Sequence, residues 1–244
     1  MILANDDPVA VALVLAVKGG DLGTLEQLLA EHQGLANARI PGRKDGSRTP
    51  LHLVTDWPGY FPNGPETVRM LIAAGADPNA TGTGRPDDET PLHWAASSDD
   101  REVAEALIDG GADLEAPGAS IAGGPPLDDA IGYGCWHVAR LLVERGARVD
   151  RLWHAAALGL RTRLEELLGA EPGPTAEDIT EAFWQACHGG QRRTAEFLLA
   201  HRPDINAIPS YSEMTALDIA GSTGTRRDLL VTWLRQIGAT SAVD

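Results

Sequence analysis

Residues 90–96 have the sequence TPLHWAA, and residues 49–53 carry the same motif as TPLHL. Each motif is followed by an apolar stretch and then by a turn that contains Gly-Ala-Asp. The apolar stretches are VRMLI at 68–72 and AEALI at 104–108, and the turns are GADPN at 75–79 and GADLE at 111–115. Because three different segments recur in the same order, the chain contains an internal repeat.

Weaker copies extend this repeat along almost the whole chain. The large apolar residue of the motif recurs in seven places: Leu13, Leu51, Leu92, Leu127, Leu152, Phe183 and Leu217. A proline or small residue suits the first turn of a helix, and the glycine of the exit turn suits a helix end. We therefore expect about seven repeats, each a pair of helices joined by a turn. One pair cannot bury its own apolar face, so neighbouring pairs must stack.

This pattern closely resembles the ankyrin repeat. The resemblance implies an all-α fold, an ankyrin-repeat solenoid of stacked helix-turn-helix repeats with short or irregular finger loops. It also implies one domain over residues 1–244. The expected repeats are 8–44 as the N-terminal cap, 45–80, 81–116, 117–150, 151–175, 176–207, and 208–244 as the C-terminal cap.

The resemblance assigns a structural role to the histidine of the TPLH motif. In the family this histidine hydrogen-bonds within the scaffold, so we expect His52 and His93 to be structural. Other repeats have a different residue at the same position, and we expect it to meet the same packing and bonding demands. These residues are Asp128, Trp153, Trp184 and Asp218.

The charge of the chain narrows the class of partner. A net charge of −15 and a pI of about 4.8 repel phosphate backbones and anionic lipid surfaces, so nucleic acid and membranes are not expected partners. A cationic or neutral partner is easier to accommodate. The basic residues are arginines except Lys18 and Lys44, a bias that indicates a GC-rich bacterial genome.

Two cysteines without a CxxC pair form no disulfide framework, which favours a reducing compartment. The chain starts without a basic segment, and the apolar run at 9–17 is too short to cross a bilayer. We therefore expect a cytoplasmic protein. Polar terminal repeats predict a monomer.

Several connections depart from the family pattern. The turn between the helices of the second repeat is expanded to residues 56–65 and contains Trp57 and Tyr60. Two interpretations stay open for it: a contact loop for a partner, or a loop whose rings cover the adjacent helices. The connections at 81–88 and 117–126 are also long, whereas residues 150–153 leave no room for a full finger.

The resemblance implies that ligands bind on the concave surface formed by the inner helices and finger tips. Carried over by position, the candidate binding residues are Asp56, Trp57, Tyr60, Trp94, Ser97, Asp129, Tyr133, His154, Gln185 and His188. Aromatic rings beside the Asp129 carboxylate favour a protein or peptide partner with a cationic side chain. The alternative is that Trp94 and His154 only pack between inner helices.

A second interpretation makes the chain an enzyme or a small-molecule-binding protein. Asp129 and His154 would then form an acid–base pair, assisted by Tyr133 or His188, with the 56–65 loop closing over them. The chain carries no recognisable nucleotide-binding, hydrolase or metalloprotease motif. Neither Asp129 with His154 and His188, nor Cys135 with His137, has a metal-ligand spacing, so no metal or cofactor is expected. A third interpretation makes it an accessory factor for a neighbouring gene product.

Overall fold

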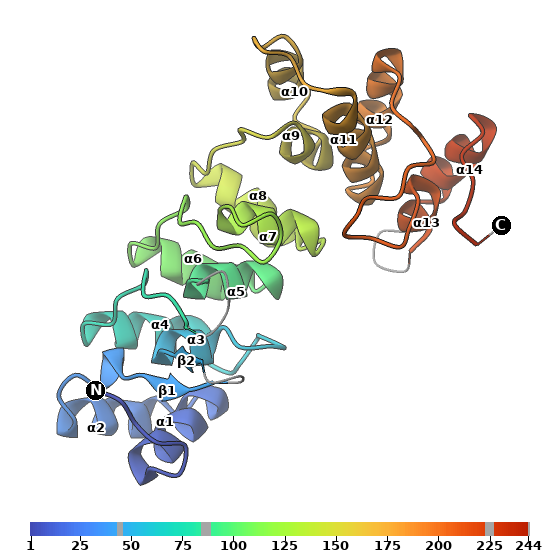
Figure 1. Cartoon of the computed structure of the whole chain (residues 1–244). Helices are drawn as coiled ribbons and strands as arrows, with labels where there is room; N and C mark the ends of the chain where they lie inside the picture. The colour runs from blue at the N-terminus through green and yellow to red at the C-terminus, as the bar shows by residue number, and fades with distance from the viewer. Residues whose placement is uncertain (43–45, 84–88, 223–226, 244) are drawn as a thin grey trace. The chain divides into compact units, whose positions relative to one another are not determined.

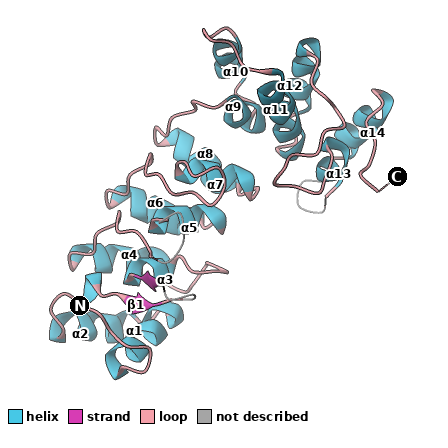
Figure 2. Ribbon diagram, in the orientation of Figure 1, coloured by secondary structure: helices cyan, strands magenta, loops and turns pink. Residues whose placement is uncertain are grey.

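The computed structural model describes residues 1–42, 46–83, 89–222 and 227–243, and nearly all of its regular structure is helical (Figures 1 and 2). The chain divides into two compact units, Met1–Ala147, called unit 1 here, and Arg148–Asp244, called unit 2. No helix among the described residues is both long and apolar enough to span a bilayer. The expectation of one domain with seven bounded repeats stays a prediction.

The described residues of unit 1 form four helical pairs in sequence order. The pairs are α1 (Pro8–Gly19) with α2 (Leu22–Glu31), α3 (Pro50–Val54) with α4 (Gly64–Ala73), α5 (Pro91–Ser97) with α6 (Arg101–Asp109), and α7 (Pro126–Gly132) with α8 (Trp136–Glu144). The first helices of successive pairs contact one another in the order α1, α3, α5, α7, and the second helices do so in the order α2, α4, α6, α8 (Figure 1). We call α1, α3, α5 and α7 the inner helices.

The connection between α2 and α3 contains a short 3-10 turn (Leu35–Asn37) and a small β-hairpin. Strands β1 (Ile40–Pro41) and β2 (Ser47–Arg48) pair antiparallel, with Ile40 opposite Arg48. Ser47 also forms an isolated antiparallel bridge with Thr83, which joins the finger of the second repeat to the finger of the third. Part of the long connection predicted at 81–88, residues 84–88, lies outside the described residues.

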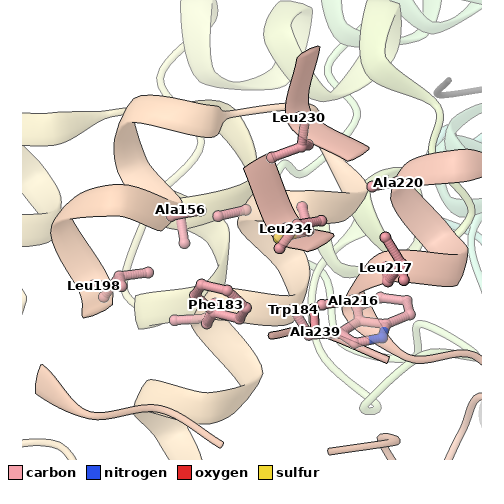
Figure 3. Packing of buried hydrophobic residues seen from close by; sticks show 14 of the residues in the cluster. Ala156, Phe183, Trp184, Leu198, Ala216, Leu217, Ala220, Leu230, Leu234 and Ala239 are labelled. Carbon is pink, nitrogen blue, oxygen red and sulfur yellow. The ribbon is translucent and has the colours of Figure 1, made fainter. Parts of the chain in front are cut away.

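Three further helical pairs are present in the part of unit 2 that the structure describes. These are α9 (Leu152–Leu158) with α10 (Arg161–Leu168), α11 (Ala176–His188) with α12 (Arg192–Leu198), and α13 (Ala216–Gly221) with α14 (Asp228–Gln236); a 3-10 turn (Leu199–His201) follows α12. Helix α11 contacts both α9 and α13. Phe183 is fully buried in a cluster built from unit 2 residues, with Leu198 and Leu234 among its members (Figure 3).

The TPLH motifs fix where the inner helices begin. The Thr49 N–H donates to His52 Nδ1 at 3.3 Å, so that nitrogen accepts and His52 Nε2 carries the proton. His52 Nε2 donates to the Glu89 carbonyl at 3.1 Å, at the start of the next repeat. His93 forms the same pair of bonds, to the Thr90 N–H and the Gly124 carbonyl. The prediction that both histidines serve the scaffold is confirmed.

In two of the repeats without this histidine, other side chains form equivalent bonds. Trp184 Nε1 donates to the Met214 carbonyl at 2.9 Å, which again links the first helix of a pair, here α11, to the following finger. Asp218 accepts from the Thr215 N–H at 3.0 Å and closes a capping box at the start of α13. The histidine position is therefore a bonding position that several residue types can fill.

Candidate binding groove

Trp94, on the inner helix α5, is held in one orientation by two neighbours. Its Nε1 donates to Glu89 Oε2 at 2.9 Å, and the edge of its ring meets the His52 ring at a centroid distance of 4.9 Å. Glu89 is buried, and Trp94 is partly exposed. A fixed aromatic ring with one free face loses little conformational entropy when a ligand packs on it.

The 56–65 loop is tied down on both sides. Tyr60 donates its backbone N–H to Asp100 Oδ2 at 2.7 Å and its hydroxyl to the Asp99 carbonyl, so it is attached to the α5–α6 turn. Asn63 Nδ2 donates to the Gly20 carbonyl of the preceding repeat. The Trp57 side chain nevertheless remains 83% exposed. Tyr60 is thus anchored to the following repeat although it stays 66% exposed, and Trp57 is the more exposed of the two rings, so both interpretations of the loop stay open.

Three aromatic rings line one cavity of about 400 Å³ beside the inner helices α5 and α7. Its lining residues are Thr55, Asp56, Trp57, Glu89, Trp94, Ser97, Ser98, Ser120 and Tyr133. Five of the candidate residues predicted from the sequence are among them: Asp56, Trp57, Trp94, Ser97 and Tyr133. We call this space the aromatic cavity.

Asp129 lies behind this cavity, not on its wall. It is fully buried on α7, and its Oδ1 accepts from the Ser120 hydroxyl at 3.0 Å and from the Ile121 N–H at 3.0 Å. Ser120 also bonds the Tyr133 hydroxyl at 3.0 Å, so a hydrogen-bonded chain joins Asp129 to the cavity wall. Burial raises the pKa of Asp129 to about 7, and the Glu89 and Asp128 carboxylates contribute to the rise.

A second cavity of about 670 Å³ adjoins the first. The two share four lining residues, Asp56, Trp57, Glu89 and Trp94, so together they form one groove. The remaining lining residues of the second cavity are Asn5, Lys18, Pro41, Gly42, Gly46, Ser47, Arg48, Gly82 and Thr83. We call the part of the groove that these remaining residues line the finger end. Most of them belong to the connections before α3 and α5.

A three-membered ion cluster stands at the finger end. Asp56 Oδ2 accepts from Lys18 Nζ at 2.7 Å and from Arg48 Nη1 at 2.9 Å. All three side chains are between a quarter and a third exposed. The sequence analysis selected Asp56 but missed both cations. Lys18 belongs to a different repeat, and Arg48 belongs to a hairpin that no sequence motif marks.

Three further candidates, His154, Gln185 and His188, belong to unit 2 and are nearly fully buried. His188 Nδ1 donates to Gln185 Oε1 at 3.2 Å, and Gln185 Nε2 donates to the Tyr211 hydroxyl at 3.1 Å. The Tyr211 hydroxyl in turn donates to Glu181 Oε1, so the network continues to the surface. Burial lowers the pKa of His188 to about 4, which keeps this imidazole neutral at pH 7.

The two members of the predicted acid–base pair belong to different units. Asp129 lies in unit 1 and His154 in unit 2, so their pairing stays a prediction, as does a single groove containing all ten candidates. The groove residues that the sequence analysis missed are chiefly Glu89, Ser120, Lys18 and Arg48. For Glu89 a signal was present, since it stands directly before the TPLH motif of the third repeat.

Comparison with known proteins agrees with the stacked helical pairs. Residues 59–151 match the family model for ankyrin repeats in three copies. The protein is an ankyrin-repeat protein. Ankyrin repeats generally mediate protein–protein interaction, and the matched residues include much of the aromatic cavity.

Two curated proteins are similar to parts of this ankyrin-repeat protein. It is 26% identical over 216 residues to a B-cell lymphoma 3 protein homolog of Mus musculus, a match that covers 87% of the chain and 41% of that protein. It is 31% identical over 123 residues to Protein PhlB of Serratia liquefaciens, covering 50% of the chain and 47% of that protein. The matches therefore span less than half of each relative.

Proposed function

We propose that this ankyrin-repeat protein binds a protein or peptide partner in the groove of unit 1, with a cationic side chain of the partner in the aromatic cavity. One observation carries the proposal. The described lining of this cavity combines three aromatic rings with the carboxylates of Asp56 and Glu89, and it contains no lysine or arginine. Rings and carboxylates around one space attract a lysine or arginine side chain by cation–π interaction and by charge, although Asp56 contributes less because Lys18 and Arg48 already pair with it.

The wider features of the chain support the same partner class. A net charge of −15 raises the local concentration of cationic partners and speeds their association at low ionic strength. We also propose that the protein is cytoplasmic and monomeric, and that it binds neither nucleic acid nor a membrane surface. The irregular 56–65 loop, which brings Trp57 to the cavity, is the element that would distinguish one partner from another.

The test starts from peptide selection, because a library can be screened before any natural partner has been identified. A random peptide library is selected against the full chain, and the affinities of the enriched peptides are measured by fluorescence anisotropy. We expect enriched sequences to contain lysine or arginine. Trp94→Ala and Trp57→Ala should each weaken binding by about tenfold or more, since buried aromatic anchors commonly contribute over 1 kcal/mol.

Leu229→Ala is the matched control, because Leu229 is a similarly exposed apolar side chain on α14 of unit 2. It should leave peptide affinity unchanged. Thermal melts of all three variants confirm that the fold is retained. Enriched peptides without basic residues, or peptides that bind the tryptophan variants as tightly as the unaltered chain, would contradict the proposal.

A further inference from the structure

The charged residues of the groove are separated along its length. The finger end carries both cations, Lys18 and Arg48, and its unshared described lining contains no carboxylate. The part shared by the two cavities carries both carboxylates, Asp56 and Glu89. Beyond it, the other described residues that line the aromatic cavity all bear hydroxyl groups. Among the described lining residues, the two cations lie only at the finger end, whereas Asp56 and Glu89 line both cavities, so the lining becomes more negative toward the aromatic cavity.

The positive charge at the finger end is incompletely neutralised. Lys18 and Arg48 both bond the same oxygen of Asp56, so one carboxylate faces two cations. Arg48 Nε is buried without a hydrogen-bond partner. The three side chains are only partly exposed, so solvent screens an approaching charge less than it would on an open surface.

The finger end also offers neutral polar groups. Ser47 and Thr83 line it, and their hydroxyl oxygens lie 2.9 Å apart across the bridge between the two fingers. Asn5 adds a side-chain amide from the N-terminal segment. Ammonium, guanidinium, amide and hydroxyl groups around one space are the donors that a carboxylate requires.

We propose that the finger end binds a carboxylate of the partner, so that the groove selects a peptide carrying an acidic group at one end and a basic side chain at the other. This rests on the proposed function of the aromatic cavity. A chain of net charge −15 repels an anionic partner at long range. An acidic group of a partner therefore binds only when a basic side chain of the same partner offsets this repulsion. The groove selects the combination of the two groups.

The experiment uses synthetic peptides derived from the library selection against the full chain. One peptide with a basic and an acidic residue is compared with its versions in which Glu is replaced by Gln, or Arg by Gln. Each is made with a free and with an amidated C-terminus, which separates a side-chain carboxylate from a terminal one. Each is titrated against the unaltered chain, Lys18→Gln and Arg48→Gln at low and at physiological ionic strength.

We expect removal of the peptide carboxylate to weaken binding to the unaltered chain by about tenfold. The same removal should change the affinity for Arg48→Gln by less than about twofold, because the interacting cation is already absent. Lys18→Arg should restore the tenfold effect that Lys18→Gln loses. Arg69→Gln is the matched control, since Arg69 lines neither cavity and pairs with Glu66 on the surface of α4.

The outcomes separate the two proposals. If peptide binding depends on the basic residue and on Trp94, but replacing the acidic residue has the same effect on the unaltered chain and on Arg48→Gln, the carboxylate site is wrong and the proposed function stands. If binding ignores both tryptophans, the proposed function itself fails. Melting curves identify any variant that has lost its fold, and Lys18→Arg then provides the independent comparison.

Discussion

At the scale of single residues, Asp129 is a carboxyl group whose pKa lies far above its ordinary value. Burial raises its pKa from 3.8 to about 7. Between those values the folded protein keeps a proton that the unfolded chain has released, so the folded state is favoured most at low pH and this contribution is lost as pH rises toward 7. Removing the titration should therefore change how stability depends on pH.

Asp129→Asn keeps the shape of the side chain and removes this titration. The free energy of unfolding of the variant, relative to the unaltered chain, should rise between pH 4.5 and pH 7.5 by about 3 kcal/mol. Urea unfolding at several pH values measures the difference. Comparing the two chains cancels the contribution of His52 and His188, whose pKa values burial lowers to about 4 and which act with the opposite sign. A difference that does not change with pH would show that Asp129 titrates normally.

His52 is a second residue whose contribution to the free energy of unfolding depends on its burial. It is fully buried and bridges its own helix start to the next finger through both ring nitrogens. His52→Ala should lower the free energy of unfolding by about 2–4 kcal/mol, from the lost bonds and the cavity left behind. Chemical denaturation checks this, with the half-buried His32→Ala as control. A loss below about 0.5 kcal/mol for His52→Ala would contradict a scaffold role.

At the scale of elements, Asp99 connects consecutive repeats. It stands in the α5–α6 turn with a φ of 56°, and its Oδ1 accepts from the N–H groups of His137 and Val138 at the start of α8. Its own carbonyl accepts the Tyr60 hydroxyl of the 56–65 loop. Asp99 therefore caps α8 in the following repeat and holds the 56–65 loop of the preceding repeat.

Replacing Asp99 should separate these contributions. Asp99→Ala loses the cap and should cost about 1–2 kcal/mol of unfolding free energy, whereas Asp99→Asn keeps an accepting oxygen and tolerates the positive φ, so it should cost less. Urea unfolding of both variants gives the comparison. Equal losses for alanine and asparagine would mean that the cap does not depend on the accepting oxygen.

The elements differ in how far the sequence predicts them. The starts of α3 and α5 were predictable, because Thr, Pro and His act within four consecutive residues. The cap from Asp99 to α8 was not, since donor and acceptor are about forty positions apart and no local pattern connects them. The same holds for the groove: Trp57, Trp94 and Tyr133 follow from repeat positions, but the Lys18–Asp56–Arg48 cluster draws on three separate elements.

At the scale of the whole molecule, the division into two units sets a limit on cooperativity. Among the described residues, the hydrophobic cluster around Phe183 draws on unit 2 alone, whereas the groove is lined by unit 1 alone. In repeat arrays stability is approximately a sum of the repeats and their nearest-neighbour interfaces. A local loss of packing should therefore spread over neighbouring repeats before it reaches distant ones.

Phe183→Ala tests this directly, because it removes a fully buried ring and should cost about 3–5 kcal/mol. We expect hydrogen exchange to accelerate in the amides of α9, α11 and α13, while the amides of α3 and α5 keep their protection and the groove keeps its peptide affinity. Leu107→Ala, in the buried face of α6, is the reciprocal variant and should spare unit 2. Equal acceleration throughout the chain would instead establish the single cooperative domain that the continuous repeat pattern predicts, and the groove would then depend on packing far from its own residues.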